Sequence, residues 1–210
     1  MVSARHIADL ACQVAAAASV LACLSWRWDS PLRSASGPVR NAAPKDAPNH
    51  STRIREAVPD DKDAIKKYTI EMAAETESCE LDPDKVDKGV AFVLGGSGLA
   101  SKYWVATDTS GKVIGMVGIS PEWSDWWGVE YWWIIAVYVA PSSRRKGVAA
   151  KMLRGVLAAA EARAVQTVNL RVEKDNTTAQ ALYRSVGFAV DPSHLVMACG
   201  RTPAGEFVGA

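Results

Sequence analysis

Metal-binding and disulfide-forming side chains are scarce in this chain. It has four cysteines, Cys12, Cys23, Cys79 and Cys199, without C-x-x-C spacing, and three histidines, none of them beside a cysteine. A structural zinc site needs such ligands clustered in sequence, and a disulfide framework needs a denser set of cysteines. We therefore expect no metal and no disulfide framework, and a reducing compartment is the simpler assumption.

Net charge and long apolar runs are lacking as well. The 24 basic and 23 acidic residues leave a formal charge of +1, so there is no reason to expect nucleic acid, which binds to a broad basic face. The apolar run from Leu10 to Leu24 is shorter than the ~20 residues that span a bilayer. With 49% hydrophobic and 22% charged residues, the 210-residue chain fits one soluble α/β domain plus an extension.

Residues 1–50 differ in composition from the rest and predict a separate extension. The Leu10–Leu24 run suits the apolar part of a signal segment, and Arg27, Arg33 and Arg40 lie beyond it among serines, alanines and prolines. This resembles a secretory or organelle address followed by a linker. The alternative is an extension without any address, in which case the cytoplasm is the default compartment. We expect a folded domain at 51–200 and a loose tail at 201–210.

The hydrophobic periodicity of residues 51–200 predicts alternating strands and helices. A first strand is expected at Ser51–Ala57, and a hairpin at Tyr103–Thr107 and Val113–Ile119. Helices are expected to begin at Pro59, after the capping Asp82, and at Val148, where Gly155 inside the helix predicts close packing. Later segments predict a strand at Val168–Asn176, a short helix that Asn176 caps, and two last strands at Phe188–Val190 and Leu195–Cys199.

The segment from Tyr131 to Val156 is a buried-strand pattern followed by a basic turn and a helix. The turn contains Arg144, Arg145, Lys146 and Gly147. The first N–H groups of a helix have no internal partner, and the helix dipole favours negative charge there. Glycine lets the main chain approach an anion closely. The turn therefore predicts a phosphate site, with an ordinary loop carrying a solvated basic cluster as the alternative.

The run Arg144-Arg145-Lys146-Gly147-Val148-Ala149 resembles the Arg/Gln-x-x-Gly-x-Gly/Ala signature of the GCN5-related N-acetyltransferases, the GNAT superfamily. The resemblance covers Thr52 to about Cys199, including the VNLRVEKDN and ALYRSVGF segments in the family's order and spacing. The WSDWWG segment, Trp123–Gly128, resembles a subgroup of bacterial members. The resemblance implies an α/β (α+β) GNAT fold, with a mixed and mostly antiparallel sheet splayed near Val139 at the acetyl-CoA site and flanked by helices.

The same resemblance implies the residues that hold acetyl-CoA. In the family, amides of the loop grip the pyrophosphate and main-chain groups of the preceding strand pair with the pantetheine arm. An asparagine touches the cofactor, and a tyrosine lies near its sulfur. The corresponding cofactor-binding residues here are Val137, Val139, Arg144, Arg145, Lys146, Gly147, Val148, Ala149, Ala150 and Asn176, with Tyr183 as the catalytic proton donor. Tyr183 as a packing residue and Asn176 as a helix cap are the competing interpretations, and both roles of Asn176 can hold together.

The acceptor side is less defined by the sequence. Trp123, Trp126 and Trp127 are expected in a polar loop with Asp125, which predicts an aromatic, acid-lined pocket for an amine, since a cation stacks on indole. Trp132 and Trp133 are expected in the core. No acid lies between Tyr131 and Arg144, where histone-modifying relatives carry one. The nearest carboxylates are Glu122, Asp125, Glu130 and Glu173, each of which could instead be a solvated charge.

The predicted activity is transfer of an acetyl group from acetyl-CoA to a primary amine of a small molecule, by direct attack in a ternary complex. A protein N-terminus or a lysine is a second possible acceptor. The alternative from a different class is a non-catalytic acyl-CoA-binding module, which the missing strand acid supports and Tyr183 opposes. The expected partners are therefore acetyl-CoA and an amine, without nucleic acid or a membrane span. The acceptor, the general base and the oligomeric state stay open.

Overall fold

The computed structural model describes residues 52–96, 101–197, 199–201 and 207–209. The predicted targeting segment and linker, residues 1–50, lie outside the described residues. Within the described part of the chain, no helix is both long enough and apolar enough to cross a membrane.

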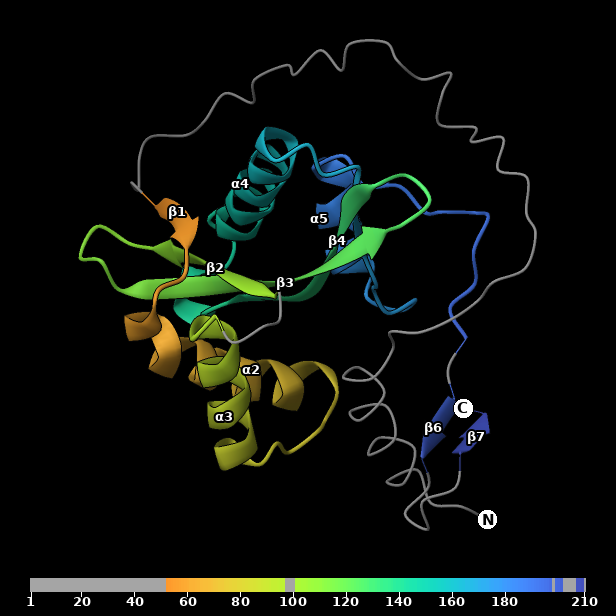
Figure 1. Ribbon diagram of the computed structural model, residues 1–210. Coiled ribbons are helices and arrows are strands. Elements are labelled where there is room, and N and C mark those ends of the chain that lie inside the picture. Colours follow the sequence, from red (N-terminus) through yellow and green to blue (C-terminus); the bar gives the residue numbers. More distant parts are fainter. Residues whose placement is uncertain (1–51, 97–100, 198, 202–206, 210) are drawn as a thin grey trace.

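One five-stranded sheet forms the centre of the fold, in the order β1-β2-β3-β4-β5 (Figure 1). The strands are β1 (Arg53–Glu56), β2 (Lys102–Thr107), β3 (Val113–Ser124), β4 (Val129–Val139) and β5 (Thr167–Leu170). Three neighbouring pairs are antiparallel, and only β4 and β5 are parallel. This confirms the mixed, mostly antiparallel sheet that the family resemblance implied.

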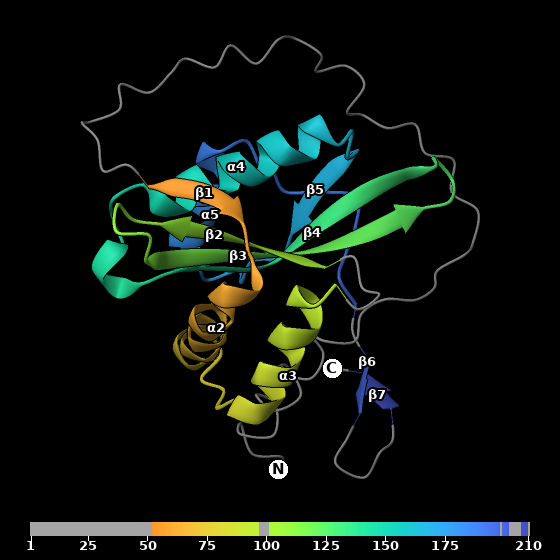
Figure 2. The same cartoon turned by 60° about the vertical axis from the view of Figure 1, so that its left-hand side comes forward.

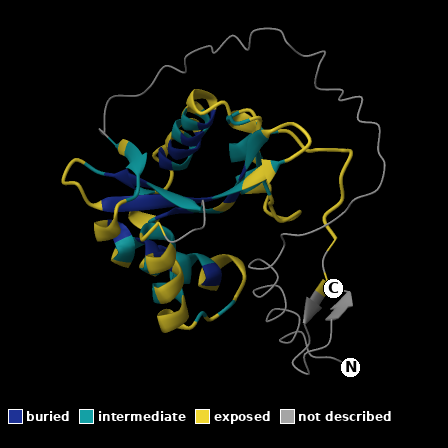
Figure 3. Ribbon diagram, viewed as in Figure 1, coloured by how far each residue is buried: buried dark blue, intermediate teal, exposed yellow. Residues whose placement is uncertain are grey.

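Helices cover both faces of the sheet (Figure 2). On one face lie α2 (Lys62–Thr76) and α3 (Pro83–Leu94), and on the other α4 (Val148–Ala162) and α5 (Thr177–Ser185). Two short 3-10 turns precede helices: Pro59–Asp61 runs directly into α2, and Pro141–Ser143 lies shortly before α4. Each face buries its own apolar cluster: Met152, Leu153 and Val156 of α4 lie in one, and Ile65 and Tyr68 of α2 in the other. The buried residues concentrate along the sheet and the inner sides of α2 and α4 (Figure 3).

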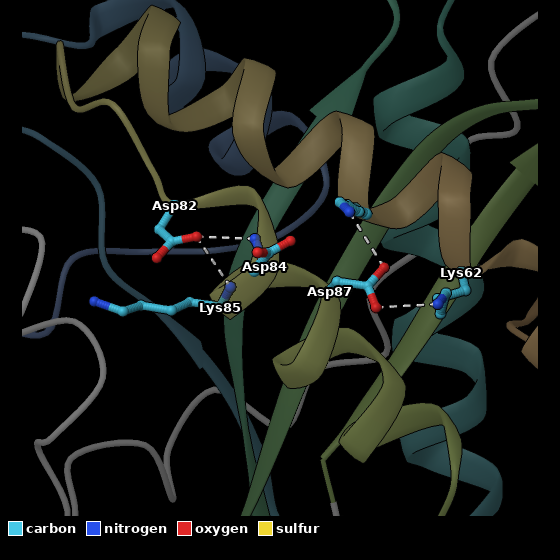
Figure 4. A network of polar contacts seen from close by, with 6 residues as sticks. Lys62, Asp82, Asp84, Lys85 and Asp87 are labelled. Atoms are coloured by element: carbon cyan, nitrogen blue, oxygen red, sulfur yellow. Dashed lines mark hydrogen bonds and ion pairs between the residues drawn. The ribbon is translucent and has the colours of Figure 1, made fainter.

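The start of α3 follows the sequence prediction. The Oδ1 of Asp82 accepts hydrogen bonds from the N–H groups of Asp84 (2.9 Å) and Lys85 (3.4 Å), as an N-cap does. One turn further on, the Asp87 carboxylate binds Lys62 and Lys66 of α2, at 3.1 and 3.3 Å (Figure 4). The two Asp87 ion pairs tie α3 to α2.

Close packing at Gly155 is also found. A Cβ at this position would lie 2.9 Å from the Cγ2 of Ile54 in β1. The glycine therefore lets α4 approach the edge strand more closely than alanine would, which offsets its helix propensity cost of about 1 kcal/mol.

Three local predictions are wrong. The strand predicted at Val113–Ile119 continues to Ser124 and pairs with β4 as far as Val129, so Trp123 lies in a strand instead of the predicted loop, while Trp126 and Trp127 lie in the turn. The predicted strand Val168–Asn176 ends at Leu170. No strand forms at 188–190 or 195–197; instead β6 (Cys199–Arg201) pairs with β7 (Phe207–Gly209) in a separate small sheet. The apolar patterns of 188–190 and 195–197 are present, but within the described part of the chain no neighbouring strand supplies the hydrogen bonds that a strand needs.

Candidate functional site

The parallel pair β4–β5, at one side of the sheet, separates partway along β4. Ile134 opposite Leu170 is the last pair between β4 and β5, after which β5 ends while β4 continues to Val139. The register of β4 against β3 shifts at the same point, because Gly118 pairs with Ala136 and Ile119 with Ile134, which leaves Ile135 as a bulged residue. The β5-side edge of β4 beyond Ile134 therefore has no strand beside it in the described part of the chain.

Main-chain groups of two residues face this open edge. The N–H of Ala140 donates to the carbonyl of Ile114 in β3, at 2.9 Å. Because main-chain groups of successive residues in a strand point to opposite sides, those of Val139 and Val137 point away from β3 and into the gap. The Val139 carbonyl accepts a hydrogen bond from Nε of Arg144 at 2.8 Å. The edge thus offers the N–H of Val139 and both main-chain groups of Val137.

Next to this edge, the turn before α4 gathers unpaired amides. Arg145 and Gly147 both have left-handed backbone conformations, with φ of 62° and 74°. The first helical bond runs from the N–H of Lys151 to the carbonyl of Gly147, at 3.0 Å. Among the described residues, no acceptor binds the six N–H groups from 145 to 150. Successive amides in such a turn at a helix N-terminus form a concave anion site.

The turn that carries the six unpaired N–H groups of 145–150, the amide cradle, is open to a ligand. A Cβ placed on Gly147 would meet no atom within 4 Å. The side chain of Lys146 folds back to donate to the carbonyl of Ser142, at 2.8 Å, so its charge stays beside the turn. The start of α4 therefore combines open space, unpaired N–H groups and positive charge, which are the features that a diphosphate-binding site requires.

Sequence reasoning missed a cluster that joins α2 to this turn. Glu75 of α2 accepts from the Tyr138 hydroxyl through Oε1 (2.8 Å) and from the Arg144 guanidinium through Oε2 (2.7 Å). Oε2 of Glu71, one turn earlier, lies 3.1 Å from the same hydroxyl, whose single proton is shared between the two carboxylates. Burial, followed by these two carboxylates, raises the pKa of Tyr138 well above its usual value. The hydrogen bond from Tyr138, and then that from Arg144, lowers the pKa of Glu75.

One signal for this cluster was present in the sequence. Glu71 and Glu75 follow Tyr68 at helical spacings of three and seven, on the same stripe of α2 that faces the sheet. The sequence could not show that Tyr138 lies opposite them.

Tyr183 and Asn176 lie at the positions predicted for them on α5. Asn176 is the N-cap, and its Oδ1 accepts from the N–H of Ala179 at 2.9 Å. The Tyr183 ring packs edge-on against Phe188, with centroids 6.0 Å apart, and borders the α4-side core. Burial raises the pKa of the Tyr183 phenol, so the proton stays on it at neutral pH. Asn176 therefore caps α5, and the Tyr183 ring packs against the core.

The aromatic residues of the long hairpin do not form an enclosed pocket. Trp123, Trp126 and Trp127 are each exposed by more than 60% at the tip. Trp132 lies in the core as predicted, only 1% exposed, whereas Trp133 faces the opposite side of the strand and is half-buried. Arg171 stacks on the Trp133 ring, 4.8 Å from its centroid.

Of the four carboxylates considered as bases, two are engaged by indoles. The Trp132 Nε1 donates to Glu130 at 3.1 Å, and the Trp133 Nε1 donates to Glu122. Asp125 and Glu173 are exposed, in the hairpin turn and after β5 respectively. No cluster of three or more His, Cys, Asp or Glu side chains able to hold a metal ion occurs among the described residues.

The sequence matches the model of a known protein family. Residues 68–188, from α2 to just beyond α5, match the Acetyltransferase (GNAT) family. A curated relative, GCN5-related N-acetyltransferase 6, chloroplastic, from Arabidopsis thaliana, is 31% identical over 136 residues. This alignment covers 60% of the present chain but 46% of the relative, so the chain spans about half the length of that protein.

Solved structures share the fold. A possible acetyltransferase from Clostridium difficile 630 superposes with a TM-score of 0.64 at 34% identity, covering 69% of this chain and 95% of that one. The enzyme AAC(6')-Iy, solved with the bisubstrate analog CoA-S-monomethyl-acetylneamine, gives a TM-score of 0.58 at 15% identity, covering 71% of this chain and 98% of that one. The splayed sheet, the amide cradle at α4 and the family match over more than half of the sequence lead to one conclusion: the chain belongs to the GNAT family of acetyltransferases.

Proposed function

We propose that this protein transfers an acetyl group from acetyl-CoA to a primary amine of a small molecule, by direct attack in a ternary complex. The observation that carries the proposal is the cradle of six free amides at 145–150 beside the open edge of β4. A diphosphate carrying an extended amide-containing arm matches these two features together. Acetyl-CoA supplies the activated acetyl thioester, and the protein supplies position and proton transfer.

The residues proposed to hold the cofactor act mainly through the backbone. The N–H groups of Arg145 to Ala150 bind the diphosphate, and the main chain of Val137 and Val139 binds the arm. Arg144 belongs to the turn through its main chain, because its guanidinium is bound to Glu75 and to the Val139 carbonyl. Asn176 adds a cofactor contact to its role as the N-cap of α5 through its amide nitrogen, since its Oδ1 is already bonded to Ala179.

Tyr183 is proposed to donate a proton to the leaving sulfur. A buried phenol with a raised pKa is protonated at neutral pH, as a proton donor must be. Its hydroxyl accepts or donates no hydrogen bond within the described residues, so it is free to serve the reaction.

The acceptor amine is proposed to bind near the hairpin. Trp123 and Trp126 expose indole faces on which a cation stacks favourably, and Asp125 and Glu130 lie in or beside the same turn. Glu130 already accepts from Trp132, which leaves its second oxygen for an amine. No acid lies between Tyr131 and Arg144. The proton of the attacking amine is therefore proposed to pass through water to a carboxylate outside this stretch. The alternative is an amine that arrives already deprotonated.

A second candidate function follows from the same missing acid. Without a base in β4, the protein could be a non-catalytic acyl-CoA-binding module, and among catalytic acceptors a protein N-terminus or lysine is the alternative to a small amine. An enzyme and a binding module would both bind coenzyme A, but only the enzyme would consume acetyl-CoA when an amine is present.

The deciding experiment measures coenzyme A release from acetyl-CoA with a panel of small amines, N-terminal peptides and lysine peptides. Turnover stimulated by a small amine supports the proposal, and stimulation by peptides alone moves the acceptor to proteins. If coenzyme A binds yet no amine raises its release above the background, the binding-module function replaces the enzyme.

We also propose that residues 1–50 form an extension that directs the domain at 51–200 to an organelle, with 201–210 as a tail. The chloroplastic designation of the Arabidopsis relative supports an organelle address. Fusion of residues 1–50 to a fluorescent reporter tests it in a plant cell: plastid fluorescence supports the address, and a diffuse signal equal to that of the reporter alone contradicts it.

A further inference from the structure

The acetyl-CoA site proposed above has two halves, and one side chain joins them. The amide cradle at 145–150 and the open edge of β4 at Val137 and Val139 belong to different elements. The Nε of Arg144 donates to the Val139 carbonyl at 2.8 Å, so it links the first residue of the turn to the end of the strand edge. The relative position of the two halves depends on where this guanidinium is held.

The guanidinium is held from α2. Its terminal nitrogen is 2.7 Å from Oε2 of Glu75, and its Cζ lies 5.2 Å from the centre of the Tyr138 ring. Both side chains of the ion pair are about 40% exposed. An isolated pair at that exposure contributes little, because water and rotamer entropy compete with it.

This pair is not isolated, because a buried tyrosine orients the carboxylate. The Tyr138 hydroxyl donates to Oε1 of Glu75 at 2.8 Å, and Tyr138 itself is only 4% exposed. Its ring packs against that of Tyr68, with centroids 5.3 Å apart, and the Tyr68 hydroxyl donates to the carbonyl of Val113 at 2.7 Å. The sheet core therefore fixes Tyr138, which fixes one oxygen of Glu75 and leaves the other aimed at Arg144.

We infer that Glu75 is a positioning residue for coenzyme A: through Arg144 it holds the strand edge and the amide cradle at the spacing the cofactor needs. Glu75 contributes no contact of its own to the ligand. A negative side chain near a phosphate site opposes the binding of an anion by its charge alone, and Glu75 acts in the opposite direction. Removing this negative charge weakens the binding of an anionic ligand.

The inference rests on the proposed function and is tested by binding rather than by turnover. Isothermal titration of the full chain with coenzyme A is expected to show about tenfold weaker affinity for Glu75→Gln than for wild type, the effect of one lost charge-assisted hydrogen bond. Glu71→Gln is the matched control. It removes the same charge one turn earlier and touches the same Tyr138 hydroxyl, but it does not reach Arg144, and its affinity is expected to stay within about twofold of wild type.

A second variant tests the same link from its other end. Arg144→Lys keeps the charge but cannot bind the Val139 carbonyl and Glu75 at once, so its affinity is expected to fall as that of Glu75→Gln does. In steady state, both variants are expected to raise KM for acetyl-CoA while kcat at saturation and the acceptor KM stay near wild type. A variant that lost only thermal stability would not raise KM for acetyl-CoA while leaving kcat and the acceptor KM unchanged.

Each outcome decides the question. Unchanged or tighter coenzyme A binding in Glu75→Gln overturns the inference, because releasing a guanidinium that served the phosphate directly would have that result. Equal losses in Glu71→Gln and Glu75→Gln also overturn it. Wild-type protein that binds no coenzyme A contradicts the proposed function instead, so the two failures are distinguishable.

Discussion

Ile134 of β4 and Leu170 of β5 are the last residues that the two parallel strands pair. Beyond them the strands separate, and the bulge at Ile135 turns β4 at the same point. A parallel ladder that stops in mid-strand leaves main-chain donors and acceptors unpaired on an otherwise complete sheet. In this protein only five residues separate the free groups of Val137 and the Val139 N–H from the amide cradle at 145–150, so the two parts of the proposed cofactor site lie close together along the backbone.

Charge introduced into the cradle is expected to abolish cofactor binding without unfolding the domain. Gly147→Glu places a carboxylate where the diphosphate would lie, and coenzyme A affinity is expected to fall more than 100-fold by titration. The positive φ of 74° adds a stability cost of about 1 kcal/mol.

A glycine elsewhere provides the matched control. Gly128 in the hairpin turn also has a positive φ, of 63°, and open space around its Cα. Gly128→Glu is expected to lose similar stability in urea unfolding and to keep wild-type coenzyme A affinity. Equal binding losses in both variants would mean that the effect comes from backbone strain and not from the cradle.

Removing the hydroxyl of Tyr183 is expected to slow the reaction and spare binding. Tyr183→Phe keeps the ring against Phe188, so the fold and coenzyme A affinity should stay unchanged. The loss of a proton donor is expected to lower kcat by about 10²-fold. Tyr103→Phe is the control, since burial also raises the pKa of that phenol, on the other face of the sheet. Identical kcat values for Tyr183→Phe and wild type would rule out the catalytic role.

The buried Asp61 is expected to make stability depend on pH. Its carboxylate binds Arg55 with both oxygens, at 2.6 and 2.9 Å, and accepts from the N–H of Val58. The hydrogen bond from Arg55 is the main cause that lowers the pKa of Asp61. A carboxyl whose folded-state pKa lies below the unfolded value stabilises the fold above that unfolded value, about pH 4, and loses this contribution as pH falls through the folded pKa.

Asp61→Asn should therefore cost about 2 kcal/mol of unfolding free energy at pH 7, and the difference from wild type should shrink below about pH 4. Arg55 is partly exposed, 29% for its side chain, which keeps the expected cost below that of a fully buried pair. Urea unfolding at a series of pH values measures it. Asp60→Asn, an exposed neighbour in the same turn, should change stability by less than 0.5 kcal/mol. A difference between Asp61→Asn and wild type that stays constant with pH would contradict the ion-pair account.

The glycine in α4 is expected to resist a substitution that helix propensity favours. Gly155→Ala would put a methyl 2.9 Å from Cγ2 of Ile54, and destabilisation of about 1 to 3 kcal/mol is expected despite the propensity gain. Ile54→Ala removes the opposing atom. In the double variant, thermal unfolding should show the two changes to be strongly non-additive. Additive free energies would mean that β1 shifts to make room.

Much of the fold followed from local sequence patterns. The predictions that failed concern segments whose structure depends on a partner strand. The α3 cap at Asp82 and the hairpin around Thr109–Gly111 depend on neighbours in sequence, so their residue types predicted them. The segment 195–197 has an apolar pattern typical of a strand, yet Leu195 is 90% exposed without a strand beside it. Likewise the pairing of Trp123 with Glu130 in a long hairpin depends on cross-strand contacts that composition alone does not reveal.

The amino-acid sequence by itself determined the family, the place of the phosphate turn and the start of α4, because the turn's glycine and the free amides of a helix N-terminus are local properties. Only the tertiary structure decided which groups the turn contacts. Tyr138 and Arg144 meet Glu75 across more than sixty residues of sequence, and a contact of that separation depends on how α2 packs against the sheet. For the same reason, the point where β4 and β5 part was fixed by the length of β5 and the bulge at Ile135, which strand propensity does not encode.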